Sequence, residues 1–393
     1  DSEKTAEILL ELEDDLRENI LSRLSAKEIA EELDELDTND AADIIGELSQ
    51  DLKAEVISEL QDVEHAKDIV DLLRYDENSA GGLMGKELVK VNENWNVLTC
   101  VKEMRIQAEN VSRVHSIYVV DDENRLKGRL SLKDLLTTST KTHISDVYIR
   151  KLNWVKVDDK DVEVARIMQK YDLEAVPVVD ELGRLVGRIT IDDIVDVIKE
   201  EAEKDYQLAA GITQDVETND SILELTKARL PWLLIGMVIE VIASFVLKGN
   251  EGAFQRYSTL IIFVPLLSAT AGNIGVQASA IVVQGLANGS LKEFSRVYFS
   301  KEIAVAMISG SIISLLLLGY HSIMYQQYLV GLAISISMVV VILFAATLGT
   351  LVPLFLHKNN IDPAIATGPF ITTANDIFGI IIYFGVAKMI LGF

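Results

Sequence analysis

The side chain best suited to chemistry in this chain is Asp376, a carboxylate in the middle of an otherwise apolar segment, Pro369–Phe393. A carboxylate at membrane depth is costly, and such acids usually face a partner or a water-filled path. Counting back by helical turns, Gly368, Thr372 and Thr373 share its face of the predicted helix. A small, polar helix face that carries a carboxylate favours a path for cations over a buried structural acid.

Five apolar segments are long enough, at about 20 residues each, to span a bilayer. They cover Leu230–Leu247, Ser258–Ala287, Ile303–Tyr320, Tyr328–Leu356 and Pro369–Leu391. Basic residues gather beside the ends of these spans that share one side of the membrane: Lys227, Arg229, Lys292, Arg296, Lys301 and Lys358. Because Lys and Arg mark the cytoplasmic side, we expect a multi-pass plasma-membrane protein with a cytoplasmic N-terminal half and its C-terminus outside.

The charge of the chain is divided as sharply as its hydropathy. Of the 60 acidic and 36 basic residues, six acidic and seven basic ones lie in residues 230–393, so residues 1–229 carry a net charge of −25. Such an acidic half repels nucleic acid and attracts cations, while the nearly neutral half suits the lipid bilayer. The single cysteine, Cys100, excludes an internal disulfide and fits a reducing compartment.

Residues 1–80 predict an acidic, all-α N domain. Leu, Ile and Val recur there at helical spacing, and Gly and Pro are almost absent. Breaks near Ser25, Asp37–Asp40 and Ser49–Asp51 carry side chains that favour helix N-termini. We therefore expect a superhelix of short antiparallel helices with an acidic exterior.

An internal repeat follows, within residues 85–203. The segment Val120–Asp134 aligns without gaps on Val179–Asp193, at an offset of 59 residues. Each copy predicts a helix, a strand, a turn, a second strand and an acidic helix. This pattern predicts a tandem α/β domain.

Both copies contain a G-x-x-[ST]-x-x-D pattern, and in this they resemble a pair of CBS modules, which usually form one regulatory body. In that family the hydroxyl and the carboxylate can hold the phosphate and ribose of an adenine nucleotide. The resemblance implies that Thr190 with Asp193, and Ser131 with Asp134, bind such a ligand, with ATP as a regulator.

The acidic helix of the second copy carries regularly spaced carboxylates. They are Asp192, Asp196, Glu200 and Glu203, followed by Asp205. Like charges three or four residues apart destabilise a helix, and a divalent cation bridging to another acidic surface would offset the repulsion. Oxygen ligands of this kind suit Mg²⁺. The alternative is a solvated helix whose repulsion is relieved by Lys199 and Lys204.

Residues 204–229 then predict a connecting, plug-like helix. Its apolar residues are Leu208, Ile212, Val216, Ile222 and Leu225, at spacings that suggest an amphipathic helix along the inner membrane face. That position suits a gating element before the pore domain, residues 230–393.

The second span contains small and polar residues at membrane depth. Pro265, Gly272 and Gly275 permit a kink or close packing, while Asn273 and Gln277 share a face one turn apart. Such a stretch lines either a helix–helix interface or a cavity.

Taken together, these residues resemble the MgtE family of magnesium channels, which has relatives among animal solute carriers. The matching motifs are Ser79-Ala-Gly-Gly-Leu-Met84, Arg229-Leu-Pro-Trp-Leu233, Gly272-Asn-Ile-Gly-Val-Gln277, and Asp362-Pro-Ala with Pro369 and Asn375-Asp376. They cover nearly the whole chain in the domain order of the family.

The resemblance implies a homodimer with a pore between its protomers, lined by the second and fifth helices. It assigns the pore acid to Asp376 and the residue one turn earlier to Thr372. The second-helix motif supplies Asn273. Gly368 occupies a position that is Asn in some members and offers only its backbone carbonyl. The function implied is Mg²⁺ uptake, gated by intracellular Mg²⁺ on the acidic cytoplasmic domains.

One alternative function remains open, and so does the role of Glu240. A Na⁺- or H⁺-coupled divalent-cation exporter would use the same spans, and Glu240 in the first span is compatible with such an exporter. Glu240 is either a second acid of the ion path or a protonated, hydrogen-bonded interior residue. An enzyme is disfavoured, because the spans contain no H-E-x-x-H, P-loop or Ser/His/Asp set.

Overall fold

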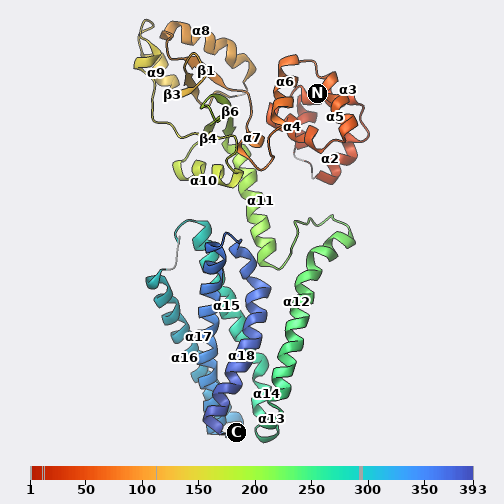
Figure 1. Cartoon of the computed structure of the whole chain (residues 1–393), viewed down its shortest axis with the longest axis vertical. Helices are drawn as coiled ribbons and strands as arrows, with labels where there is room; N and C mark the ends of the chain where they lie inside the picture. Colours follow the sequence, from red (N-terminus) through yellow and green to blue (C-terminus); the bar gives the residue numbers. More distant parts are fainter. Residues whose placement is uncertain (1, 11, 13, 112, 292–294, 393) are drawn as a thin grey trace. The chain divides into compact units, whose positions relative to one another are not determined.

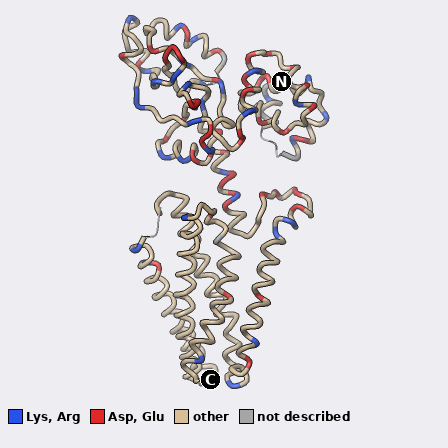
Figure 2. Tube along the Cα trace, in the orientation of Figure 1, with Lys and Arg blue, Asp and Glu red and all other residues tan. Residues whose placement is uncertain are grey.

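The computed structural model describes residues 2–10, 12, 14–111, 113–291 and 295–392 (Figure 1). The chain forms two compact units, residues 1–201 and 202–393, and each is described by itself. Charged residues are dense in the first unit and sparse along the long helices of the second (Figure 2). The observed division matches the charge asymmetry of the sequence.

The N domain consists of short helices, as predicted. They are α1 (Ser2–Leu10), α2 (Asp14–Leu21), α3 (Ala26–Leu33), α4 (Thr38–Glu47), α5 (Gln50–Glu59) and α6 (Val63–Leu72). Ser25 caps α3 in a reciprocal capping box with Glu28. Ile29, Leu33 and Ile44 are fully buried, so the apolar faces of these helices form the core.

A four-residue helix, α7 (Ala80–Leu83), connects the N domain to the repeat. Ser79 caps it by accepting a hydrogen bond from the Gly82 backbone. A Cβ at Gly81 would lie 2.6 Å from Cγ of the Tyr75 ring, and one at Gly82 would lie 2.8 Å from Cα of Glu77. The glycines of the Ser79–Met84 motif therefore allow the backbone to pack closely against the end of the N domain.

The first repeat is a three-stranded sheet with helices. Its elements are β1 (Val89–Asn92), α8 (Val97–Gln107), the 3₁₀ helix η1 (Ala108–Asn110), β2 (Ile117–Val120), β3 (Leu126–Leu130), α9 (Leu132–Thr137) and the 3₁₀ helix η2 (Ile144–Asp146). Strand β2 is central, parallel to β1 and antiparallel to β3. The initial strand β1 was not anticipated from the sequence.

The second repeat has the same topology. It contains β4 (Val155–Lys156), α10 (Asp161–Tyr171), β5 (Ala175–Val179), β6 (Leu185–Thr190) and α11 (Ile191–Ala209), with β5 parallel to β4 and antiparallel to β6. Backbone hydrogen bonds join the repeats where β3 and β6 begin: Leu126 to Gly183 (3.0 Å) and Leu185 to Asn124 (2.9 Å). The predicted tandem α/β domain is confirmed.

The prediction of one helix over 204–229 is wrong. Helix α11 ends at Ala209, and Gly211 adopts a left-handed backbone (φ 83°), with its N–H bonded to the Leu208 carbonyl at 3.0 Å. A non-helical segment follows, and α12 (Ile222–Gly249) starts only at the Ser221–Glu224 capping box. Apolar residues at helical spacing continue across the non-helical segment, but the helix itself ends where Gly211 adopts a left-handed backbone.

The five membrane-spanning helices are confirmed among the described residues. They are Ile222–Gly249, Thr259–Ala287, Arg296–Met324, Tyr328–Lys358 and Gly368–Leu391. In element terms they are α12, α14 (Thr259–Ile262) with α15 (Val264–Ala287), α16 (Arg296–Met324), α17 (Tyr328–Lys358) and α18 (Gly368–Leu391). Two short helices complete the unit, α13 (Glu251–Arg256) and the 3₁₀ helix η3 (Pro363–Ala366).

Helix α17 is the centre of this unit. It contacts α15, α16 and α18, whereas α12 packs mainly along α18 (Figure 1). Accordingly α17 is the most buried span and α12 the least. The arrangement places α12, α15 and α18 around the carboxylate singled out from the sequence.

Candidate functional site

The entry into α18 is fixed by two short capping structures. Asp362 accepts a hydrogen bond of 2.8 Å from the backbone N–H two residues on and caps η3. Pro369 lies in the first turn of α18, where a missing N–H costs no helical bond. The Asp362-Pro-Ala motif therefore sets where α18 starts, and hence where Asp376 lies.

Helices α15 and α18 pack closely through glycines. A Cβ at Gly275 would lie 2.6 Å from Cγ2 of Ile371 and would overlap the amide of Asn375. A Cβ at Gly272 would lie 3.2 Å from Cγ2 of Thr372. The glycines of the second-span motif thus allow α18 to approach α15.

Asn375 belongs to this packing. Its side chain is 1% exposed, and its amide donates to the backbone carbonyl of Ala271 at 3.4 Å. Its Oδ1 has no hydrogen-bond partner among the described residues. The side chain of the adjacent Asp376 lies outside this interface between α15 and α18 and is only half-buried.

Asp376 contacts polar side chains from two other spans. Its carboxyl group interacts with the Ser268 hydroxyl of α15 and with the Glu240 carboxyl of α12. Carboxyl groups this close repel each other when both are ionised, unless a proton or a cation lies between them. Oxygen ligands of this type suit Mg²⁺.

The hydroxyls on the Asp376 face are held by their own helix. Thr372 Oγ1 donates to the Gly368 carbonyl at 3.0 Å, and Thr373 Oγ1 donates to the Pro369 carbonyl at 2.7 Å. Each hydroxyl oxygen therefore keeps lone pairs to offer to a cation or its water. The carbonyl of Gly368, in contrast, already accepts from Thr372.

The end of α11 lies against the start of α18. A Cβ at Gly368 would overlap the Ala209 carbonyl, and a Cβ at Gly211 would lie 2.5 Å from Cγ of Pro369. Gly368 is therefore part of a backbone contact between α11 and α18. This packing accounts for a residue without a side chain at that position.

Asn273 lies apart from the Asp376 contacts in the protomer. It is about 140° around α15 from Ser268, given 100° per residue. Its side chain is exposed, in a stripe of small and polar residues at one-turn intervals: Ala269, Asn273, Gln277, Ala280 and Gln284. A polar stripe at membrane depth suits a partner helix or a water-filled path more than lipid.

The two predicted nucleotide pairs differ in accessibility. Asp193 accepts hydrogen bonds from the Thr190 hydroxyl (2.7 Å), the Thr190 N–H (2.8 Å) and the Asn39 amide of α4 (2.9 Å). Ser131 begins α9 without a side-chain capping bond, and both Ser131 and Asp134 are partly exposed. Ser131 and Asp134 form the more open pair, because Asp193 contacts Asn39 of the N domain.

The predicted sensor carboxylates all lie on α11. We call them the α11 acids: Asp192, Asp196, Glu200, Glu203 and Asp205. No group of three or more His, Cys, Asp or Glu in the described part of the chain is placed to hold a metal ion. These acids therefore remain a predicted sensor face that does not form a closed ligand set by itself.

Further carboxylates crowd the contact between α4 and the second repeat. Burial, and then the charge of Asp193, raise the pKa of Asp40 to about 7. Asp43 is exposed to solvent, yet desolvation by the atoms around its carboxyl group, and then the charge of Glu77, raise its pKa to about 7. One ion pair at this contact is long, with Arg188 at 3.9 Å from Asp37, and Arg17 offsets part of the charge around Asp43. The protein itself therefore compensates the negative charge at this contact only in part.

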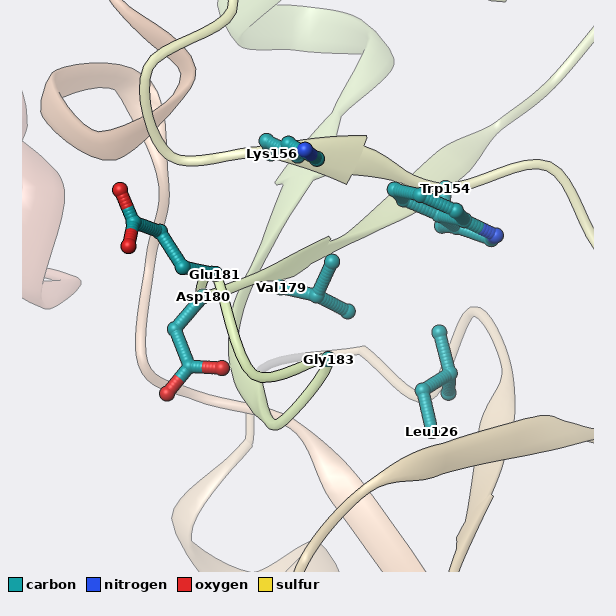
Figure 3. Close-up of a pocket in the computed structure, with 7 residues that line it drawn as sticks. All are labelled: Leu126, Trp154, Lys156, Val179, Asp180, Glu181 and Gly183. Carbon is teal, nitrogen blue, oxygen red and sulfur yellow. The ribbon is translucent and has the colours of Figure 1, made fainter.

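A separate pocket of about 210 Å³ lies at the hairpin end of the second repeat. Leu126, Trp154 and Val179 line one part of it, while the carboxylates of Asp180 and Glu181 point to another side (Figure 3). None of the four predicted nucleotide-binding residues lines it. Those residues lie at or just after the C-terminal ends of β3 and β6, whereas the pocket lies near the N-terminal ends of these strands. The pocket and the predicted nucleotide sites are therefore separate.

Comparison with known proteins agrees with this organisation. Family models match at residues 264–386 (MgtE, divalent cation transporter), 1–78 (MgtE intracellular N domain), and 80–140 and 144–200 (CBS domain). The magnesium transporter MgtE of Thermus thermophilus is 35% identical over 329 residues, covering 82% of this chain and 72% of the relative. That of Enterococcus faecalis is 33% identical over 326 residues, covering 82% and 72%.

One solved structure is also similar in part. The cytosolic domain of the Mg²⁺ channel MgtE in complex with ATP is 36% identical, covers 50% of this chain and 80% of that chain, and has a TM-score of 0.47.

The fold and the family models define a multi-pass membrane protein with a soluble N-terminal region, of the divalent-cation-transporter class. Within that class, the chain belongs to the MgtE family.

Two contacts at these sites were missed in the sequence. Ser268 lies within the apolar second span. Its contact with Asp376, which belongs to another helix, cannot be predicted from the spacing of residues in either helix. Arg188 was assigned no role from the sequence, yet its side chain is 6% exposed and donates to the Glu87 carbonyl. A basic residue within an otherwise apolar strand was the available signal for a polar contact there.

Proposed function

We propose that the chain forms a homodimeric channel that carries Mg²⁺ into the cell across the plasma membrane. The observation that carries the proposal is Asp376, in the middle of a span, at the protomer surface and in contact with Ser268 and Glu240. The relatives' activity supports the identity of the ion, because curated magnesium transporters are 35% and 33% identical over most of the chain.

The exposed polar stripe on α15 supports a pore between two protomers. Asn273 and Gln277 are exposed at membrane depth in the single chain. Facing lipid, these amides would lose their hydrogen bonds with water, so a second protomer and a hydrated path explain their exposure better. In this arrangement Asp376 and Thr372 contact the hydrated ion, and Asn273 lines the path from α15.

We propose further that intracellular Mg²⁺ closes the channel through the cytoplasmic half. The α11 acids and the crowded carboxylates near α4 supply sites for several weakly held cations. Binding of these cations favours the arrangement in which negative surfaces approach each other, as a population shift requires. An adenine nucleotide at Ser131 and Asp134 is a second regulatory ligand in this proposal.

Asp376→Asn tests conduction, because it removes the charge and keeps the size of the side chain. We expect Mg²⁺ uptake into proteoliposomes to fall at least tenfold while the dimer, followed by size-exclusion chromatography, stays intact. Wild-type uptake by the correctly inserted variant would remove Asp376 from the mechanism.

The coupled-exporter alternative has one observation in its favour, the Glu240–Asp376 contact, since paired carboxyl groups also serve proton or Na⁺ coupling. Uptake measured with and without an opposing Na⁺ or pH gradient separates the two. A channel follows the Mg²⁺ gradient and the membrane potential alone, whereas an exporter requires the second gradient.

A further inference from the structure

Helix α12 lies along α18 in a fixed register. Three pairs of residues define it: Trp232 with Phe370 (ring centroids 6.4 Å apart), Gly236 with Thr373 (a Cβ on the glycine would lie 3.8 Å from Cγ2), and Glu240 with Asp376. Each pair is about one helical turn beyond the last on both helices. The two helices therefore run in the same direction and present matching faces.

This register makes residue 240 the position on α12 that reaches Asp376. One turn earlier α12 offers Gly236, and one turn later it offers Ser244, whose hydroxyl donates to its own helix at 2.6 Å. A single acidic residue on an apolar helix is thus placed at the level of the predicted pore acid. A change of register by one turn would separate the two carboxyl groups.

Among the described residues, the middle parts of α12, α15 and α18 carry no fixed positive charge. The segments 230–247, 258–287 and 369–387, which include the middle of α12, α15 and α18, contain no Lys, Arg or His. The contacts of Asp376 that involve these helices are a hydroxyl and a carboxyl group. Neutralisation of the pair as carboxylates must therefore come from a mobile cation.

The exposure of Glu240 indicates where that cation arrives. Glu240 is exposed in the protomer although it lies in the middle of a span. An ionised side chain facing lipid at that depth is costly, so this surface must face water or a second protomer. The interior-residue reading of Glu240 is not supported, because its side chain is not buried.

We propose that Glu240 is a second carboxylate of the ion path, so that each protomer contributes two acids to the site of the hydrated divalent cation. The inference rests on the proposed function, since it extends the site built on Asp376. In a homodimer the site then carries four carboxylates, which accept hydrogen bonds from the water that Mg²⁺ retains. Helix α12 becomes part of the conduction path alongside α15 and α18.

The first test measures the Mg²⁺ dependence of uptake by proteoliposomes. Glu240→Gln should raise the half-saturating Mg²⁺ concentration by about tenfold, the order expected when a full charge beside a divalent ion in a hydrated site is removed. Glu240→Asp keeps the charge and should restore at least half of that shift. The matched control is Glu302→Gln, which removes a partly buried acid of α16, a helix that contributes none of the contacts given for Asp376.

The outcomes separate this inference from the proposed function. Loss of uptake in Asp376→Asn with an unchanged half-saturating concentration in Glu240→Gln would overturn the role of Glu240 alone. A lower maximal rate without a change in half-saturation would also overturn it, because that is the mark of a structural role. Wild-type behaviour of Asp376→Asn would instead refute the proposed function.

The second test does not depend on conduction. The single native cysteine, Cys100, is buried, and its burial raises the pKa of its thiol to about 11, so it reacts poorly with thiol reagents. In the full-length chain, Glu240→Cys should be labelled by a water-soluble cationic methanethiosulfonate, and millimolar Mg²⁺ should slow the labelling at least threefold. Ile312→Cys on α16, exposed at 55%, is the lipid-facing control and should remain unlabelled. Absence of labelling at position 240, or labelling that Mg²⁺ does not slow, would contradict the inference.

Discussion

Asp40→Asn should stabilise the soluble half at neutral and alkaline pH. In the folded protein the pKa of Asp40 is raised from 3.8 to about 7, first by burial and then by the negative charge of Asp193. Each pKa unit corresponds to about 1.36 kcal/mol, so the ionised carboxylate costs about 4 kcal/mol as an upper limit. Partial solvent access, and the favourable placement of an acid in the first turn of α4, reduce this to about 2 kcal/mol.

The sign of the pH dependence follows from the raised pKa. Between pH 4 and pH 7 the unfolded chain has released this proton and the folded chain still binds it, so stability falls as the pH rises through this range. Above about pH 7 both states are ionised and the full cost is present. The difference between Asp40→Asn and the wild type should therefore be greatest at pH 8 and nearly absent at pH 4.

Hydrogen exchange of the α4 amides in the full-length protein measures this effect. In EDTA at pH 8, and after correction for intrinsic exchange rates, we expect Asp40→Asn to raise protection about thirtyfold, equivalent to about 2 kcal/mol. Millimolar Mg²⁺ should narrow the difference, because cations neutralise the wild-type carboxylates. Asp51→Asn, an exposed acid in the first turn of α5, is the matched control. Equal protection at pH 8, or a difference that grows on acidification, would refute the reasoning.

The other predictions concern the sensor, the nucleotide and the helix packing. Neutralising the α11 acids together should leave the channel open at high Mg²⁺. It should also reduce the protection that Mg²⁺ gives residues 206–229 against protease. Equal protection in the variant and the wild type would mean that the sensor lies elsewhere. Asp134→Ala should weaken ATP binding to the full-length protein at least tenfold and Asp193→Ala less, whereas no ATP binding by the wild type would end this idea. Gly275→Val should separate α15 from α18, lower the free energy of unfolding by about 1–3 kcal/mol and abolish uptake. Gly319→Ala is the control, because a Cβ added there would meet no atom within 4 Å, and it should be tolerated in the same thermal and transport assays.

Features that depend on local sequence were predicted well. The five spans follow from uninterrupted apolar length, which a bilayer selects directly. The helix start after Ser25 follows from the Ser25 side chain, which accepts a hydrogen bond from the backbone of Glu28, only three residues away. The strand–turn–strand units of the CBS pair follow from a repeat that shows the same pattern twice.

The errors arose where a local signal was overlooked or where the answer depended on distant residues. The prediction of one helix over 204–229 ignored Gly211 and the Ser-x-x-Glu capping signal at Ser221, both of which were visible in the sequence. The contact between Glu240 and Asp376 depends on how α12 and α18 align, which no spacing within either helix determines. Strand β4 contains only two residues and is defined by its pairing with β5, so its own sequence carried almost no signal.

Helix α11 begins at Ile191, directly after β6 ends at Thr190, with no residue between them to serve as a flexible joint. Its 19 residues make a rod about 28 Å long at 1.5 Å per residue. Its last residues belong to the second unit, where the Ala209 carbonyl lies against Gly368. The phase of the helix matters at this contact, because one residue inserted before Ala209 would turn the end of α11 by about 100° and present a different face to α18.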